Sequence, residues 1–346
     1  DLPGDMPDIR VLLAEVRGSA TIDAPNGVTV KTEAGMTLLE SGGAGKVVAS
    51  ISQRSVQIKL DPSGRVATAE DGVKVVPKGA SYLGFKGISY SGIISLSALS
   101  GGKMRVTNTL PLETYLEGVL PHEMGNPGTE GIDALKTQAV AARTYAMGRI
   151  TQRSGEPFDV FAGVQDQVYK GKKGNNKLAT SAVRDTRGMV MAYNGALVKA
   201  YYCACCGGHT SDIRRVWPGR EPADYLHGIF DRGDNSNRSF CYENRYFRWR
   251  YSFSGKQLGA ILRSTLPKVL GIPAESIGEI KDLRIDERTN SGRVVRLTIV
   301  TSKGDFVVEG DRIRWALVVD LDKNRILPSV MFRLEKFMEL DRLAFV

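Results

Sequence analysis

The sequence predicts an α+β fold, and three observations along its 346 residues indicate this class. Short apolar or alternating runs, separated by turn residues, fill the N-terminal part. Two stretches with helical spacing follow, and the tail combines one helical pattern with several strand patterns. We therefore expect a β-rich N-terminal domain at residues 1–107, a central helical unit with a loop-rich cleft at 108–253, and a C-terminal α/β segment at 254–346 that completes the core.

The strand and turn signals can be placed along the chain. The N-terminal part has runs typical of β-strands at residues 9–13, 28–32, 47–51 and 55–60. Turn sequences separate them, namely Pro25-Asn26-Gly27, Pro62-Ser63-Gly64 and Gly101-Gly102. In the tail, the spacing predicts a helix over 254–270 and strands over 280–286, 293–301 and 305–309.

An isolated acid, Glu123, lies in the joint between the two central helices. Pro111 begins the first helix, and Pro121 is expected to end it, because proline donates no backbone hydrogen bond and restricts the residue before it. The second helix is expected over about residues 129–150. Glu123 would then lie just past a helix C-terminus, where the dipole raises a carboxyl pKa by the equivalent of roughly 0.3–1 kcal/mol. Burial must supply any larger rise, so a carboxyl held there is a candidate general acid.

Arg143 lies inside the apolar stripe of the second helix rather than opposite it. A guanidinium that points inward needs a carboxylate or several carbonyls, because an unpaired buried charge is very costly. The expected partner is Glu117, Glu123 or a ligand. The alternative interpretation is an ordinary surface acid at position 123 and an arginine whose side chain reaches water.

All four cysteines lie between residues 203 and 241. Cys203, Cys206 and His209 have the spacing of a zinc knuckle, and Cys241 can complete a tetrahedral site. The alternative is a disulfide between Cys206 and Cys241, with no metal ion, in an oxidising compartment. The residues alone leave both interpretations open.

The same region is rich in aromatic residues, since residues 201–253 contain 12 of the 26 Phe, Trp and Tyr residues. Aromatic rings with polar edges pack against the apolar faces of sugar rings, and they are also common in partly solvated clefts of other kinds. The region is therefore a candidate wall of a sugar-binding cleft.

The overall charge favours anionic partners, because 47 basic against 38 acidic residues leave a net charge of +9. No basic run or recognition helix indicates a nucleic-acid partner, and no apolar stretch approaches the roughly 20 residues of a membrane span. The chain opens DLPGDMPDIRVLL, without a leader pattern, so we expect a mature or trimmed protein. Membrane contact is then expected only through an N-terminal anchor outside this sequence.

The central segment closely resembles the SpoIID family of peptidoglycan-acting proteins. The resemblance rests on motifs that match in order over about 205 residues, namely Asn108, Leu110, Leu112-Glu113, Tyr115-Leu116, Gly118-Val119, Glu123-Met124, Ala134-Leu135-Lys136, the run QAVAARTYA at 138–146, Gln167-Val168-Tyr169 with Gly171, Ala182-Val183, Thr186 with Gly188, Cys206-Gly207-Gly208-His209-Thr210, Val216-Trp217, Tyr225-Leu226, Ser291-Gly292-Arg293-Val294 and Arg314. Thr137 departs from the usual alanine, and Asn126-Pro127 stands near the family's Met-Pro step. Neither departure touches the acid.

The resemblance implies a lytic transglycosylase that cleaves the MurNAc–GlcNAc bond of peptidoglycan and leaves 1,6-anhydro-MurNAc ends. Glu123 would be its single catalytic acid and base, since no second carboxylate is marked by the motif. The alternative, from another class, is a non-catalytic member that binds glycan and enhances a cell-wall amidase. Either function implies glycan strands as partner and an extracytoplasmic location.

The resemblance also implies further site residues. Arg143, Gln167 and Tyr169 are expected to bind substrate, and Tyr225 and His227 are expected to line the cleft, although His227 stands where lysine is common. Some relatives bind zinc with a histidine at the position of Cys203 and a cysteine at that of His209. This chain exchanges the two residue types, which keeps a donor in each place.

Overall fold

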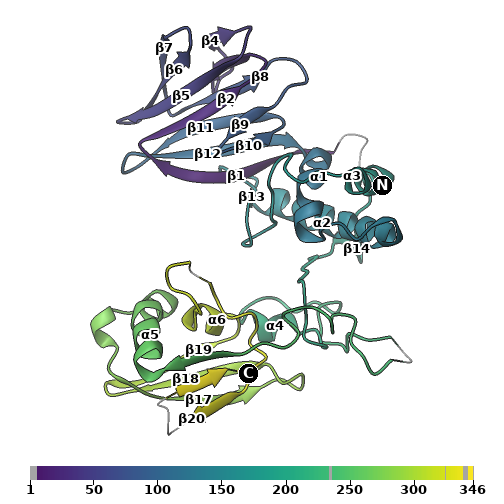
Figure 1. Ribbon diagram of the computed structural model, residues 1–346, viewed down its shortest axis with the longest axis vertical. Coiled ribbons are helices and arrows are strands. Elements are labelled where there is room, and N and C mark those ends of the chain that lie inside the picture. The colour runs from purple at the N-terminus through teal and green to yellow at the C-terminus, as the bar shows by residue number, and fades with distance from the viewer. Residues whose placement is uncertain (1–5, 234–235, 324, 338–341, 346) are drawn as a thin grey trace. The chain divides into compact units, whose positions relative to one another are not determined.

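The computed structural model describes residues 6–233, 236–323, 325–337 and 342–345 and confirms the α+β class. The chain forms two compact units, residues 1–202 and residues 203–346 (Figure 1). The division into domains at 107/108 and 253/254 stays a prediction.

The first unit begins with two β-sheets that share one hydrophobic core. The seven-stranded sheet has the order β13-β1-β12-β11-β8-β3-β4, with bounds Val160–Phe161, Asp8–Arg17, Lys103–Pro111, Ile93–Leu99, Gly72–Pro77, Val28–Thr32 and Thr37–Ser41. The six-stranded sheet has the order β10-β9-β2-β5-β6-β7, with bounds Ile88–Tyr90, Leu83–Phe85, Ser19–Ala24, Gly45–Ser52, Ser55–Asp61 and Arg65–Glu70.

The alternation of buried and exposed side chains explains which strands could be predicted from the sequence. The four predicted runs fall within β1, β3, β5 and β6, so these predictions are confirmed. In β6, apolar residues on one face are buried and polar residues on the other are exposed. In β12, by contrast, Val106, Thr107 and Asn108 are buried in succession, so this strand has no simple period of two. Most of the remaining strands were missed, because several are short or lack the alternating pattern.

The chain passes from β12 directly into α1, Leu112–Glu123, without a loop. The prediction that Pro121 ends this helix is wrong, because Pro121 lies in its last turn. Proline removes one hydrogen bond there, but the N–H of Met124 still donates to the carbonyl of Leu120 over 2.9 Å and closes the turn. His122 Nε2 also lies 2.7 Å from the carbonyl oxygen of Lys173. Glu123 is therefore the last residue of the helix.

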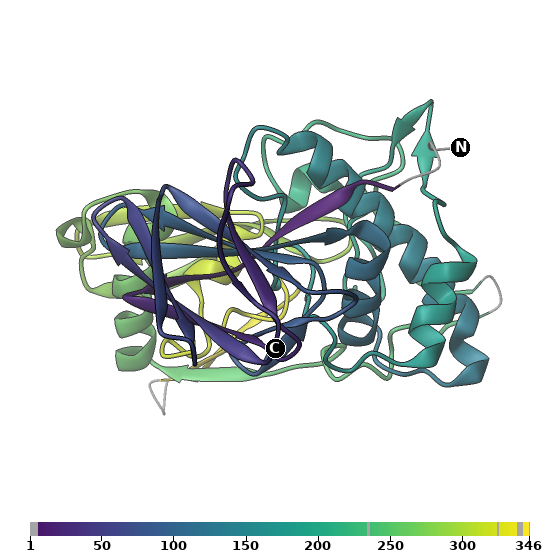
Figure 2. The ribbon, with the colours of Figure 1, turned by 90° about the horizontal axis from the view of Figure 1, so that it is seen from above.

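Two more helices pack beside α1 at one end of the sheets (Figures 1 and 2). The predicted second helix is present as a 3₁₀ turn, Thr129–Gly131, followed by α2, Ile132–Gln152. A third helix, α3, Lys177–Asp185, lies in a region expected to be loop-rich. Asn176 caps it, since its side-chain oxygen accepts the N–H of Ala179. The hairpin β14–β15, Ala192–Tyr193 and Ala196–Leu197, follows.

Arg143 of α2 is fully buried and joins the three helices. Its Nε and one terminal nitrogen donate to the two carboxylate oxygens of Glu113 in α1, each over 2.8 Å. The guanidinium also donates to the carbonyls of Val183 in α3, over 3.2 Å, and Met189, over 3.1 Å. Burial of the guanidinium against a carboxylate is as expected. The named partners Glu117 and Glu123 are wrong, because Glu113, in the first turn of α1, is the acid that faces α2.

The second unit is built on a separate core. Its three-stranded sheet β17-β18-β19, Ile280–Arg288, Val294–Thr301 and Gly304–Glu309, confirms the strands predicted for the tail. Helix α5, Gly255–Leu270, confirms the predicted helix and begins with a capping box between Ser254 and Gln257. The remaining elements are α4, η2 and α6, at Ile213–Val216, Ala274–Ser276 and Arg312–Ala316, and the sheet β16-β21-β20, at Tyr251–Ser254, Arg342–Phe345 and Leu334–Phe337.

We expect Arg143→Ala to lower the free energy of unfolding by about 3–5 kcal/mol, because it leaves the Glu113 carboxylate buried without its partner. Denaturant unfolding followed by circular dichroism measures this loss. Arg184→Ala is the matched control, since Arg184 pairs with Asp185 on the surface and its loss changes stability little. Equal stability of the two variants would contradict a structural role for Arg143.

Candidate functional site

Glu123 is held at the end of α1 by the backbone of a distant segment. Its Oε1 accepts a hydrogen bond of 2.6 Å from the N–H of Val168, 45 residues later in the chain. The side chain is half-buried. Within the described part of the chain, no hydrogen bond engages the second carboxylate oxygen, Oε2. One oxygen is thus fixed, and the other can carry a proton.

Burial raises the pKa of Glu123 above its ordinary value, and this effect is larger than the opposing effects of the Val168 N–H and of neighbouring His122. This agrees with the expectation that burial, more than the helix dipole, raises the pKa of this carboxyl group. A glutamate with a raised pKa holds its proton at a higher pH, as a general acid requires.

The segment Gln167-Val168-Tyr169 packs against α1 and α2. Gln167 is fully buried, where its Nε2 donates to the carbonyl of Ala142 and its Oε1 accepts the hydroxyl of Tyr115. Tyr169 is also buried, and its hydroxyl donates to Asn108 over 2.9 Å. Both side chains therefore serve the core around Glu123, and their contact with substrate, like that of buried Arg143, stays a prediction.

Two glycines allow this segment to lie against α1 on one side and against β10 on the other. A Cβ at Gly118 would come within 2.5 Å of the carbonyl oxygen of Gly171 and 2.7 Å of the Tyr169 ring. A Cβ at Gly171 would come within 2.2 Å of the carbonyl oxygen of Ser89, and its φ of +52° also favours glycine. The position of the Val168 N–H, and hence of Glu123, depends on these close approaches.

Two polar residues near Glu123 were missed by the sequence reasoning. The hydroxyl of Tyr202 accepts a hydrogen bond of 2.9 Å from Gln167 Nε2. The pKa of Tyr202 is raised, first by burial and next by the charge of Glu123. The side-chain amide of Gln138 lies beside this hydroxyl and acts in the opposite direction, lowering the pKa of Tyr202. Gln138 belongs to the QAVAARTYA run, but its periodicity did not distinguish it from the other residues of α2.

The second unit brings two of the cysteines together with an acid. The Sγ atoms of Cys206 and Cys241 are 3.6 Å apart, and Asp231 Oδ2 lies 3.0 Å from Cys206 Sγ. Both thiols are free. Burial, followed by the hydrogen bond to Asp231, raises the pKa of Cys206 to about 12. Cys206, Asp231 and Cys241 form a group that can hold a metal ion.

The other residues predicted for this region lie outside that group. Cys203 is exposed, and His209 places its Nδ1 2.7 Å from the carbonyl oxygen of Thr210. Tyr225 is half-buried, whereas His227 is exposed, with its Nδ1 2.6 Å from the carbonyl oxygen of Asp224. Glu123 belongs to the first unit and these residues to the second, so a cleft that they share stays a prediction.

The aromatic region of the second unit presents several rings to solvent, among them Phe230, Phe240, Tyr242 and Tyr246. Arginines stack on some of these rings, such as Arg238 over Tyr242 at 4.3 Å from the ring centroid. The rings are therefore available for contact, and their role as a sugar-binding wall stays a prediction.

Comparison with known protein families finds a match in each of the two units. Residues 100–193, which contain α1, α2 and Glu123, match the family model of SpoIID, described as stage II sporulation protein. This segment, and with it the surroundings of Glu123, is therefore similar to the SpoIID family. Residues 214–346 match a family described as a domain of unknown function, DUF8618.

Curated relatives agree with the SpoIID assignment. The stage II sporulation protein D of Bacillus subtilis (strain 168) is 27% identical over 215 residues, which are 57% of this chain and 60% of the relative. The amidase enhancer of the same strain is 40% identical over 107 residues, 31% of this chain and 14% of the enhancer. An uncharacterized protein of Brachyspira hyodysenteriae is 34% identical over 220 residues, 62% of this chain and 56% of that protein. The chain thus spans less than two thirds of the length of each of these relatives.

The SpoIID segment allows a direct test of the glycine contacts. We expect Gly118→Ala to destabilise the chain by about 1–3 kcal/mol, because the added methyl group displaces the segment that carries the Val168 N–H. Gly148→Ala is the matched control in a neighbouring helix. Its Cβ would meet nothing within 4 Å, so it should stabilise α2 by up to about 1 kcal/mol. Chemical unfolding measures both, and a destabilising Gly148→Ala or a neutral Gly118→Ala would contradict this account.

Proposed function

We propose that this chain is a peptidoglycan lytic transglycosylase in which Glu123 is the single acid and base. The observation that carries the proposal is the geometry of Glu123: a half-buried carboxyl with a raised pKa, fixed through one oxygen and open at the other. The match of residues 100–193 to the SpoIID family supports a function at the cell wall.

The proposed reaction is an intramolecular transfer at the MurNAc–GlcNAc bond. Protonated Glu123 donates its proton to the glycosidic oxygen while the bond from MurNAc C1 to that oxygen breaks, which releases GlcNAc with a free hydroxyl. The resulting carboxylate then takes the proton of the MurNAc C6 hydroxyl, whose oxygen bonds to C1. The product end is 1,6-anhydro-MurNAc, no water is consumed, and Glu123 is protonated again for the next cycle.

The surroundings of Glu123 support this dual role. The Val168 N–H stabilises the carboxylate form that exists between the two proton transfers, and burial favours the protonated form that begins and ends the cycle. The two effects act on the same carboxyl group in opposite directions. The Val168 N–H thus limits the rise in pKa that burial causes, and a group that must donate and then accept a proton needs both forms to be accessible.

A non-catalytic role is the second candidate function. It is favoured by the similarity to the amidase enhancer, which at 40% identity covers 107 residues. In that case the chain would bind glycan strands and stimulate a cell-wall amidase without cleaving the strand itself. The two functions differ in one product, the anhydro end.

Both functions imply an extracytoplasmic location, in the periplasm, in the cell wall or in the surrounding medium. The net charge of +9 suits an anionic cell-wall polymer. Among the described residues, none of the helices is both long and apolar enough to cross a membrane.

Zinc at the cysteine group is part of the proposal. Two thiolates bound to one tetrahedral zinc lie roughly 3.8 Å apart, given a Zn–S distance of about 2.3 Å. The 3.6 Å between Cys206 and Cys241 fits this arrangement, and Asp231 supplies a third donor. Cys203 or His209, both members of the predicted set, would supply the fourth donor after a local movement of the loop. A zinc ion bound by four protein ligands would be structural, and a disulfide between Cys206 and Cys241 is the alternative.

The catalytic proposal is tested with Glu123→Gln, which preserves size and the hydrogen bond from Val168 but cannot deliver a proton. We expect activity to fall by about 10²–10⁴-fold, measured as anhydro ends by mass spectrometry of purified glycan strands. For the wild type, kcat/KM should decline as the pH rises through the raised pKa of Glu123, because the first step needs the protonated form.

Glu117→Gln is the matched control for that experiment. Glu117 lies on the same helix, is also half-buried and has a pKa that is raised by burial, yet it has no role in the proposed reaction. Full activity of Glu123→Gln would remove Glu123 from the mechanism. If the wild type binds glycan, forms no anhydro ends and accelerates an added amidase, the enhancer function replaces the transglycosylase.

The metal proposal is tested on protein purified without chelator. One zinc per chain, four thiols titratable after denaturation and a fall in Tm on addition of chelator are expected. No metal and two titratable thiols would instead support the disulfide. Asp231→Asn separates the two further, because it should weaken zinc binding but leave a disulfide intact.

A further inference from the structure

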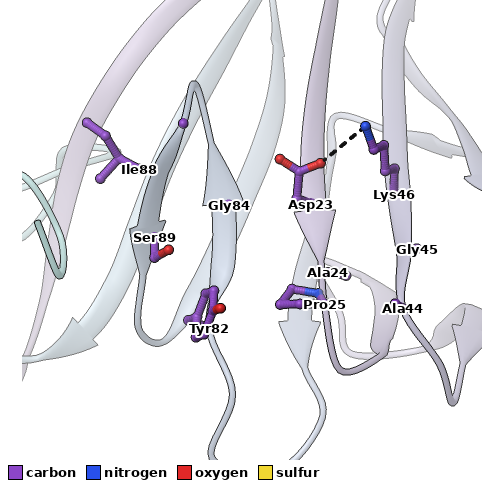
Figure 3. A pocket seen from close by; sticks show the side chains of 11 residues that line it. Asp23, Ala24, Pro25, Ala44, Gly45, Lys46, Tyr82, Gly84, Ile88 and Ser89 are labelled. Atoms are coloured by element: carbon purple, nitrogen blue, oxygen red, sulfur yellow. Dashed lines mark ion pairs between the residues drawn. The ribbon is translucent and has the colours of Figure 1, made fainter.

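A pocket of about 520 Å³ lies on the six-stranded sheet of the first unit, outside the segment that matches SpoIID (Figure 3). It is open to solvent and is lined by residues of β2, β5 and the β9–β10 hairpin, together with the turns beside them. Nothing in the proposed reaction uses it. Figure 3 shows Asp23 and Lys46 on adjacent strands, and Tyr82 and Ser89 on the hairpin.

Strand register places the polar residues of the pocket in one row. Asp23 of β2 pairs with Lys46 of β5 on one side and with Gly84 of β9 on the other. Gly84 in turn pairs with Ser89 of β10. Directly paired residues point to the same face of a sheet, so the row presents a hydroxyl, a gap, a carboxylate and an ammonium group to the same side.

The gap exists because Gly84 has no side chain. A Cβ there would lie 2.9 Å from the Cβ of Asp23, so a larger residue would fill the floor of the pocket. The Asp23 carboxylate and the Lys46 ammonium are 3.6 Å apart and about half exposed, at 52% and 62% of their side-chain surfaces. Their polar atoms therefore remain accessible to a ligand, and their opposite charges favour a neutral ligand over an ion.

An aromatic ring forms one wall of this pocket. Tyr82 is 37% exposed, and the Nζ of Lys172 lies 5.5 Å from its ring centroid. The N–H of Lys172 donates to the carbonyl of Ser89 over 2.8 Å. Lys172 follows four residues after Val168, which holds Glu123. The segment that positions the candidate acid thus also borders the pocket.

We propose that this pocket is an accessory subsite for one sugar of the glycan strand on which Glu123 acts; this inference rests on the proposed function. Tyr82 would pack against the apolar face of the sugar ring. The Asp23 carboxylate would accept hydrogen bonds from sugar hydroxyls, and Lys46 and Ser89 would donate to sugar oxygens. A neutral N-acetylated sugar unit satisfies all of these groups, and the subsite holds the strand while its bond at Glu123 is broken.

Binding is measured by calorimetry in the Glu123→Gln background, where turnover is strongly reduced, with peptide-free glycan strands as the probe. Tyr82→Ala and Asp23→Asn should each raise Kd about tenfold. The exposed Asp23–Lys46 pair adds little to stability, so Asp23→Asn should fold normally, and unchanged Tm values check both variants. Thr21→Ala is the matched control, since Thr21 is exposed two residues earlier on the same face of β2 but does not line the pocket.

The outcomes separate this inference from the proposed function. If both pocket variants bind as tightly as Thr21→Ala, the subsite is overturned while the catalytic proposal stands. If the pocket variants weaken only strands that carry stem peptides, the pocket recognises peptide and the sugar assignment is overturned. If the wild type forms no anhydro ends but the pocket variants still lose tenfold in affinity, the subsite stands and the transglycosylase proposal falls.

Discussion

The ion pair between Arg143 and Glu113 is the interaction on which the helical part of the first unit depends. Both carboxylate oxygens are engaged by the buried guanidinium, and its remaining donors reach backbone carbonyls beyond α2. A buried ion pair of this kind stabilises the fold no more than good apolar packing would. Loss of either partner is nevertheless strongly destabilising, because it leaves the other charge buried and unpaired. It therefore fixes how α1, α2 and α3 meet, and so fixes where α1 ends.

The end of α1 matters because it carries Glu123, whose hydrogen-bond donor, the N–H of Val168, comes from a distant segment of the chain. The Val168 N–H reaches Glu123 because Gly118 lets the segment approach α1, and Gly171 lets it approach β10, without intervening side chains. The buried side-chain amide of Gln167, in the same segment, is hydrogen-bonded to the hydroxyls of Tyr115 and Tyr202 and so holds the segment in place. A rigid support of this kind suits a catalytic carboxyl, whose orientation must not relax when its charge changes.

The same segment links the helical part to the strands. After Val168 and Tyr169 it turns at Gly171, and Lys172 then bonds to β10 and covers the ring of Tyr82. The β-rich part of the first unit thus contributes more than a platform for the helices, because it borders the segment that supports the acid. Within the second unit, the cysteine group has its own support, since Arg293 donates to the carbonyl of Cys206.

Residue patterns were sufficient to predict the elements whose signal is local: the alternating strands β3, β5 and β6, the helix with Arg143 in its apolar stripe, and the acid at the joint between two helices. Periodicity reports which face of an element is buried, but it does not report what lies against that face. The pairing of Glu113 with Arg143, the hydrogen bond from Val168 to Glu123 and the contact of Asp231 with Cys206 become visible only in the folded chain. Each of them joins residues 25 or more positions apart. Even the path of α1 through Pro121 was decided this way, since packing and the contact of His122 with a distant carbonyl outweighed a local preference.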